Sequence, residues 1–135
     1  MLKLMIGVKG TGKTKALINL VNTAVDNSHG DVVCIEKGTK LRYDVKYQAR
    51  LIDTNEYFVT DAASLYGFVA GILASNHDVT DLFIDSALKI CNNNVADFEK
   101  FIDGVNALSE KLNIKVVMTS SVPVEEATDT MKKYI

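Results

Sequence analysis

The sequence has few of the residues that build disulfide scaffolds, zinc modules or membrane spans. Its 135 residues include two cysteines, one proline and no tryptophan. Cys34 and Cys91 lie far apart and form no CxxC pair, which argues against a disulfide framework or a zinc ribbon. The longest nearly apolar run, residues 65–74, is too short to cross a bilayer. We therefore expect no membrane insertion.

The chain also lacks an excess of charge of either sign. Fifteen basic and seventeen acidic residues give a formal net charge of −2, so there is no clear nucleic-acid signature. Residues 1–10, MLKLMIGVKG, have neither the long apolar core nor the small-residue cleavage site of a signal peptide. These features lead us to expect a cytoplasmic protein.

What the sequence does contain is an alternation of short apolar runs with amphipathic segments. Apolar residues make up 47% of the chain and charged residues 24%, a balance typical of one globular domain, here residues 1–135. We expect strands at residues 2–6, 31–36, 81–85 and 114–119, and helices that begin near Thr14, Asp61, Val95 and Val124. This order predicts an α/β fold with three layers, α/β/α, around a mostly parallel sheet.

One segment has a different pattern. Between residues 41 and 52 every second position is apolar and the positions between are mostly polar. A period of two predicts an extended segment with one covered face.

In parallel sheets ligands bind at the carboxyl ends of the strands, and the loop after residue 6 carries the strongest motif. Residues 7–14, GVKGTGKT, fit G-x-x-x-x-G-K-[ST], the P-loop or Walker A motif, between an expected strand and an expected helix. In this motif the backbone amides surround phosphate oxygens, Lys13 reaches the β- and γ-phosphates, and Thr14 offers its hydroxyl to magnesium. The expected nucleotide-binding residues are Gly7, Val8, Lys9, Gly10, Thr11, Gly12, Lys13, Thr14 and Lys15.

With this loop the chain resembles the P-loop nucleoside triphosphatases over nearly its whole length. The run LFIDS is similar to their magnesium strand, which implies that Asp85 and Thr14 hold Mg²⁺. Ser86 follows where many members have a catalytic Glu, but in the RecA-like ATPases that Glu comes from the strand after the phosphate-loop helix. Here that strand ends in Glu36. The resemblance therefore implies ATP and Mg²⁺ as ligands and Glu36 as the base.

The strand IKVVMTSS resembles the sensor strand of the same family, whose polar tip contacts the γ-phosphate or the attacking water. By position, Thr119 and Ser120 match that tip. Glu36, Lys13 and Thr119 are thus the expected catalytic residues. Thr119 and Ser120 can equally be ordinary loop hydroxyls, and Glu36 a solvated charge beside Lys37.

Three functions are open at this point. The first is a RecA-like ATPase that is slow when alone, although the chain is much shorter than RecA-like motors and has no evident DNA-binding loops. The second is a nucleotide-dependent switch or adaptor that presents a surface to a protein partner. The third is a small-molecule kinase, because DVVCIEKGTKLRY is similar to thymidine kinases. Those enzymes, however, have Asp-Glu on the magnesium strand and a cysteine-rich zinc module.

The basic residues near residue 40 have two interpretations. Arg42 and Arg50 are the only arginines, and Lys37 and Lys40 lie in the same stretch. In a self-associating protein any of the four could complete the site of a neighbouring subunit, as charges supplied in trans do in GTPases. Alternatively, they form only the solvated face of the expected extended segment.

Overall fold

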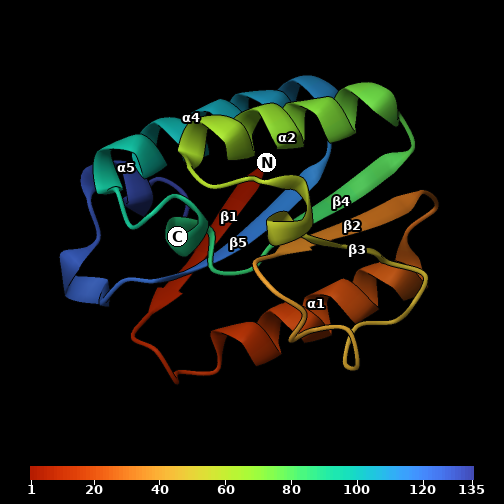
Figure 1. Ribbon diagram of the computed structural model, residues 1–135, viewed down its shortest axis with the longest axis horizontal. Coiled ribbons are helices and arrows are strands. Elements are labelled where there is room, and N and C mark those ends of the chain that lie inside the picture. The colour runs from red at the N-terminus through yellow and green to blue at the C-terminus, as the bar shows by residue number, and fades with distance from the viewer.

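The chain folds around a sheet of five parallel strands, as the expected α/β class requires. The computed structural model describes residues 1–135 (Figure 1). The strands are β1 (Leu2–Gly7), β2 (Asp31–Glu36), β3 (Arg50–Asp53), β4 (Val79–Ile84) and β5 (Lys115–Ser121). They lie in the order β1-β5-β4-β2-β3. The strands that carry the phosphate motif and Asp85 are therefore separated by one strand, β5.

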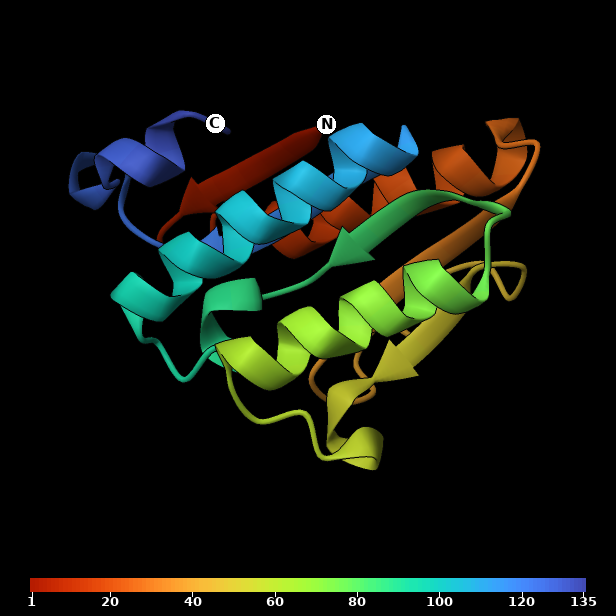
Figure 2. The ribbon, with the colours of Figure 1, turned by 90° about the horizontal axis from the view of Figure 1, so that it is seen from above.

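Helices cover both faces of this sheet. The longer helices are α1 (Lys13–Asn27), α2 (Ala62–Ser75) and α4 (Val95–Leu112). The chain crosses the sheet in one direction through α1, from β1 to β2, and returns through α2 and α4. Because such crossovers are right-handed, α1 lies on one face and the other two helices on the opposite face (Figure 1). Seen from above, α2 and α4 lie side by side across the sheet (Figure 2).

Four short elements complete the fold. They are the 3-10 turns η1 (Thr54–Tyr57) and η2 (Val124–Glu126) and the one-turn helices α3 (Ala87–Ile90) and α5 (Asp129–Lys132). The helix expected from Val124 is thus divided, because Ala127 is extended and Thr128 caps a new helix. None of the helices has both the length and the apolar character needed to cross a membrane.

The two faces of the sheet differ in how much they bury. The core under α2 and α4 contains 26 buried residues, whereas the cluster under α1 contains eight. Three of those eight, Leu41, Val45 and Ala49, come from the loop between β2 and β3. This loop therefore acts as a second cover on the α1 face.

The path of that loop corrects the extended segment expected over residues 41–52. Only Arg50–Asp53 form a strand, and residues 40–49 are mostly turns. The buried positions recur every fourth residue, while Tyr43 and Tyr47 are 83% and 91% exposed. The loop coils because the amide of Val45 donates to the carbonyl of Leu41, and the Asn22 side chain bonds the backbone at both Asp44 and Lys46.

Candidate functional site

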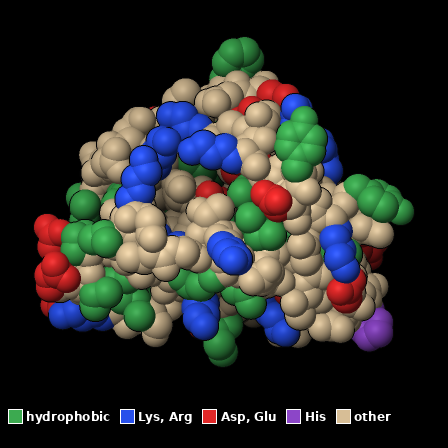
Figure 3. Space-filling model, turned by 90° about the horizontal axis from the view of Figure 1, so that it is seen from below, with side chains coloured by type: hydrophobic (Ala, Val, Ile, Leu, Met, Phe, Trp, Pro, Cys, Tyr) green, Lys and Arg blue, Asp and Glu red, His purple; other side chains and the backbone are tan.

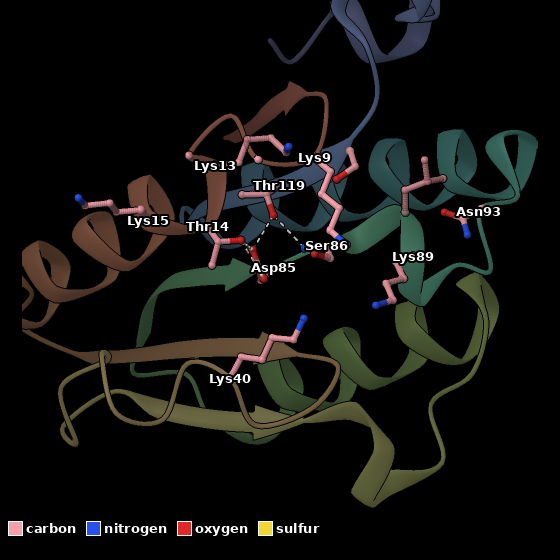
Figure 4. Close-up of a pocket in the computed structure, with 14 residues that line it drawn as sticks. Lys9, Lys13, Thr14, Lys15, Lys40, Asp85, Ser86, Lys89, Asn93 and Thr119 are labelled. Carbon is pink, nitrogen blue, oxygen red and sulfur yellow. Dashed lines mark hydrogen bonds between the residues drawn. The ribbon is translucent and has the colours of Figure 1, made fainter.

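The candidate site is a cavity of about 650 Å³ at the carboxyl ends of β1, β4 and β5 (Figure 4). Fourteen residues line it, and Leu88 is the only hydrophobic one. Eight of the expected site residues line the cavity together: Lys9, Gly10, Gly12, Lys13, Thr14, Lys15, Asp85 and Thr119. Gly7, Val8 and Thr11 belong to the same loop but do not line the cavity. The wall is therefore suited to a polar ligand.

The phosphate motif folds as a loop with free backbone donors. Gly10 and Gly12 have φ angles of 87° and 85°, a left-handed conformation that only glycine adopts without strain. No backbone amide of residues 8–12 donates a hydrogen bond within the chain. The helix α1 that follows has no side-chain cap, unlike α2 and α4, which Asp61 and Asn94 cap. Loop and helix start together offer unpaired N–H groups to an anion.

The side chains around the cavity are mostly basic. Five lysines line it, against a single carboxylate, that of Asp85. Three of the lysines belong to the loop and the start of α1, and the other two are Lys40 and Lys89. In the view from below, basic side chains stand around a hollow in the surface (Figure 3). This field favours a ligand with several negative charges.

Lys13 lies along its own loop. Its Nζ donates to the carbonyl of Val8 at 2.9 Å and to Thr11 Oγ1 at 3.4 Å. These contacts hold the ammonium group beside the free amides of the loop. Lys13 is thus placed where it and those amides can bind one anion together.

Asp85 is the centre of a small hydrogen-bond network. Thr14 Oγ1 lies 3.2 Å and Thr119 Oγ1 2.8 Å from Asp85 Oδ1 (Figure 4). Thr119 Oγ1 also accepts from the amide of Ser86, which has a left-handed φ of 56°. The amide of Asp85 donates to the carbonyl of Ile35, which ties this strand end to β2. The expected pair Thr14–Asp85 is therefore brought together from two elements.

The pair Thr14–Asp85 fits a magnesium ion only in part. Both side chains offer the oxygen ligands that Mg²⁺ prefers. The chain has no cluster of three or more His, Cys, Asp or Glu that could hold a metal by itself. A magnesium ion at this position would need phosphate oxygens and water to complete its octahedron, which is how Mg²⁺ is bound in phosphate sites.

Glu36 lies at the same sheet edge as Asp85 but does not line the cavity. Its side chain is buried, with 3% of the residue exposed. Oε1 accepts from the amide of Lys40 at 3.1 Å and Oε2 from that of Leu41 at 3.2 Å. Burial raises the pKa of this carboxyl above its ordinary value, and the charges of Asp85 and Asp53 also raise it. The two amides lower the pKa and offset only part of this shift. Each carboxylate oxygen of Glu36 thus accepts a hydrogen bond from the backbone of the loop that follows.

The hydroxyl groups at the end of β5 also make hydrogen bonds within the chain. Ser120 Oγ accepts from the amide of Leu88 at 3.2 Å and donates to the carbonyl of Thr119. Ser120 is buried, while the next residue, Ser121, lines the cavity. The hydroxyls of Thr119 and Ser120 therefore hold this strand to Asp85 and to α3.

The residues near position 40 divide into two groups. Arg42, Arg50 and Lys37 do not line the cavity, and the Arg42 guanidinium lies 4.8 Å from the ring centroid of Tyr43. Lys40 does line it, as do Lys89 and Asn93, which sequence reasoning missed. No motif in the sequence indicated either Lys89 or Asn93.

The comparisons with known proteins add no relative to this picture. No protein-family model matches the chain, and a search of curated proteins found no match.

Proposed function

We propose that the cavity binds a nucleoside triphosphate, ATP by the family resemblance, with magnesium. The observation that carries the proposal is the loop of residues 7–14. The complete motif follows β1 and opens α1, its amides are unpaired, and Lys13 lies beside them. This combination of free N–H groups, a helix start and a lysine is how P-loops hold phosphates.

The proposal gives each residue of the cavity a role. The loop amides and Lys13 bind the phosphates, and Thr14 with Asp85 holds magnesium. When bound, magnesium neutralises charge on the phosphate oxygens and fixes their orientation. The remaining lysines of the cavity supply the background positive charge that attracts the triphosphate.

Slow ATP hydrolysis is the second part of the proposal, and it rests on the RecA-like resemblance. A general base must reach the attacking water directly or through one further water. Glu36 is the predicted base, and its strand end lies next to Asp85 through the bond from the Asp85 amide to Ile35. Because Glu36 is buried and does not line the cavity, a water molecule reaches its carboxylate only when the loop after β2 moves. We therefore expect a low rate.

The binding proposal is tested by Lys13→Ala, with Lys111→Ala as the control. Lys111 is exposed in α4 and does not line the cavity. A hydrogen bond from a charged group contributes about 1.5–3 kcal/mol, so Lys13→Ala should weaken Mg·ATP binding about 10- to 100-fold. Calorimetric titration measures the affinity, and circular dichroism checks the fold. Equal affinities for the two folded variants would overturn the proposal.

Turnover then separates the alternatives. Phosphate release by the wild-type protein supports the ATPase, and binding without release supports the nucleotide-dependent switch. Transfer of phosphate to an added nucleoside instead of water would identify a kinase.

A further inference from the structure

The short stretch of chain after β2 is held more firmly than its place in a surface loop suggests. The Gly38 amide donates to Asp53 Oδ1 at 2.8 Å, and Glu36 accepts from the amides of Lys40 and Leu41. The Leu41 side chain, 2% exposed, packs into the cluster under α1. The backbone at Lys40 is thus fixed by hydrogen bonds on one side and by a buried side chain on the other.

The side chain of Lys40 uses this fixed backbone to reach the cavity. Figure 4 shows it rising toward Asp85 from below, while Lys13 and the phosphate loop lie on the other side of Asp85. The Lys40 ammonium group makes no ion pair, since the chain's two salt bridges involve Lys46 and Lys133. A lysine without a carboxylate partner therefore faces the cavity from the wall opposite the loop.

We propose that Lys40 is a further phosphate-binding residue, supplied by the same chain, and that Glu36 is the positioning residue that holds it. The inference rests on the proposed nucleotide binding. A phosphate held by the loop amides directs its remaining oxygens away from them, toward the opposite wall. The Lys40 side chain faces the cavity from that wall, so Lys40 contacts the terminal phosphate of a triphosphate.

Glu36 contributes by preorganisation. Without its carboxylate, the amides of Lys40 and Leu41 lose their acceptors and the turn is free to move. A ligand would then have to order the loop on binding, which lowers its affinity. Glu36 therefore influences ATP affinity in the ground state, whereas a general base influences only the rate of the chemical step.

The first experiment compares Mg·ATP with Mg·ADP. Calorimetry on Lys40→Ala should show an ATP affinity about tenfold lower, because one charge-assisted bond of about 1.4 kcal/mol or more is lost. The ADP affinity should change less than about twofold, because the missing bond is to the terminal phosphate of ATP, which ADP lacks. The matched control is Lys37→Ala, an exposed lysine of the same loop that does not line the cavity. An unchanged ratio of ATP to ADP affinity in Lys40→Ala overturns the assignment.

The second experiment tests the positioning role. Glu36→Gln keeps the size of the side chain but has one acceptor oxygen where Glu36 uses two. Glu36→Gln should lose most of the preference for ATP over ADP that Lys40→Ala loses. Adding Lys40→Ala to Glu36→Gln should lower the ATP affinity no further, because both changes remove the same contact of Lys40 with the terminal phosphate. Equal loss of ATP and ADP affinity in Glu36→Gln would show a structural role only and would overturn this part.

These outcomes can be distinguished from a failure of the proposed nucleotide binding. Lys13→Ala should weaken the binding of both ADP and ATP, since Lys13 also reaches the β-phosphate. A wild-type protein that binds neither nucleotide overturns both proposals. A wild-type protein that binds both, with Lys40→Ala identical to Lys37→Ala, overturns only the role of Lys40.

Discussion

The hydroxyl of Thr119 links three parts of the candidate site, and its removal should destabilise the protein measurably. Thr119 is 1% exposed, donates to Asp85 Oδ1 at 2.8 Å and accepts from the amide of Ser86 at 2.8 Å. Thr119→Val keeps the shape of the side chain and removes only these two bonds. Thr119→Ser keeps the hydroxyl and removes only a methyl group.

The two changes have different expected magnitudes. The bond to the Asp85 carboxylate contributes about 1.5–3 kcal/mol, and a buried amide left without a partner costs about 1–3 kcal/mol. We therefore expect Thr119→Val to lower the free energy of unfolding by about 3–4 kcal/mol. Loss of one methyl group in Thr119→Ser should cost about 1 kcal/mol. The free energies of unfolding of the two variants should therefore differ by about 2–3 kcal/mol.

Urea unfolding at neutral pH measures this difference directly. With a slope of about 2–3 kcal/mol per molar urea, the midpoint of Thr119→Val should lie about 1 M below that of Thr119→Ser. If Thr119→Val were as stable as Thr119→Ser, the network would not hold the end of β4, and the hydroxyl would be free for a ligand as the family resemblance implies.

Two further predictions concern the carboxylates of the site. Asp85→Ala should abolish the dependence of ATP affinity on magnesium. Metal-free ATP should still bind, because the loop amides and Lys13 remain. If titrations of this variant with and without Mg²⁺ match those of the wild type, Asp85 is not part of the metal site. Glu36 has a pKa raised above 4.5 by burial, so the folded state binds its proton more tightly than the unfolded state. Its contribution to stability is therefore greatest below about pH 4.5 and is lost as the pH rises through the raised pKa. The free energy of unfolding of the wild type minus that of Glu36→Gln should fall as the pH rises through the raised pKa; a constant or rising difference would contradict this burial effect.

Much of the fold could be predicted because local patterns and tertiary structure agree. The apolar runs before Gly7 and Asp85 are buried strands, and the apolar face that includes Leu17 and Val21 packs α1 against the sheet. The juxtaposition of Thr14 and Asp85, 71 positions apart, followed from the rule that parallel strands end at one edge.

The features that the sequence did not predict depend on the path of the loop after Glu36. Leu41, Val45 and Ala49 are spaced by four, which satisfies a period of two as well as a coiled path. Only the exposure of Tyr43 and Tyr47 distinguishes these alternatives, and exposure is a tertiary property. For the same reason no sequence pattern indicated that Glu36 accepts from its own loop or that Lys40 enters the cavity.

The position of β1 in the sheet has a consequence for how the protein is made. β1 lies at the edge, and its only strand partner is β5, which pairs Leu2 with Val116 and Gly7 with Ser121. Such a long-range pairing forms late, because most of the intervening chain must be ordered first. During synthesis the edge of β1 that pairs with β5 therefore stays open to pairing with other chains until residues 115–121 have left the ribosome. The loop of residues 7–14, which begins at the end of β1, is therefore fixed in place only when β5 has paired with β1.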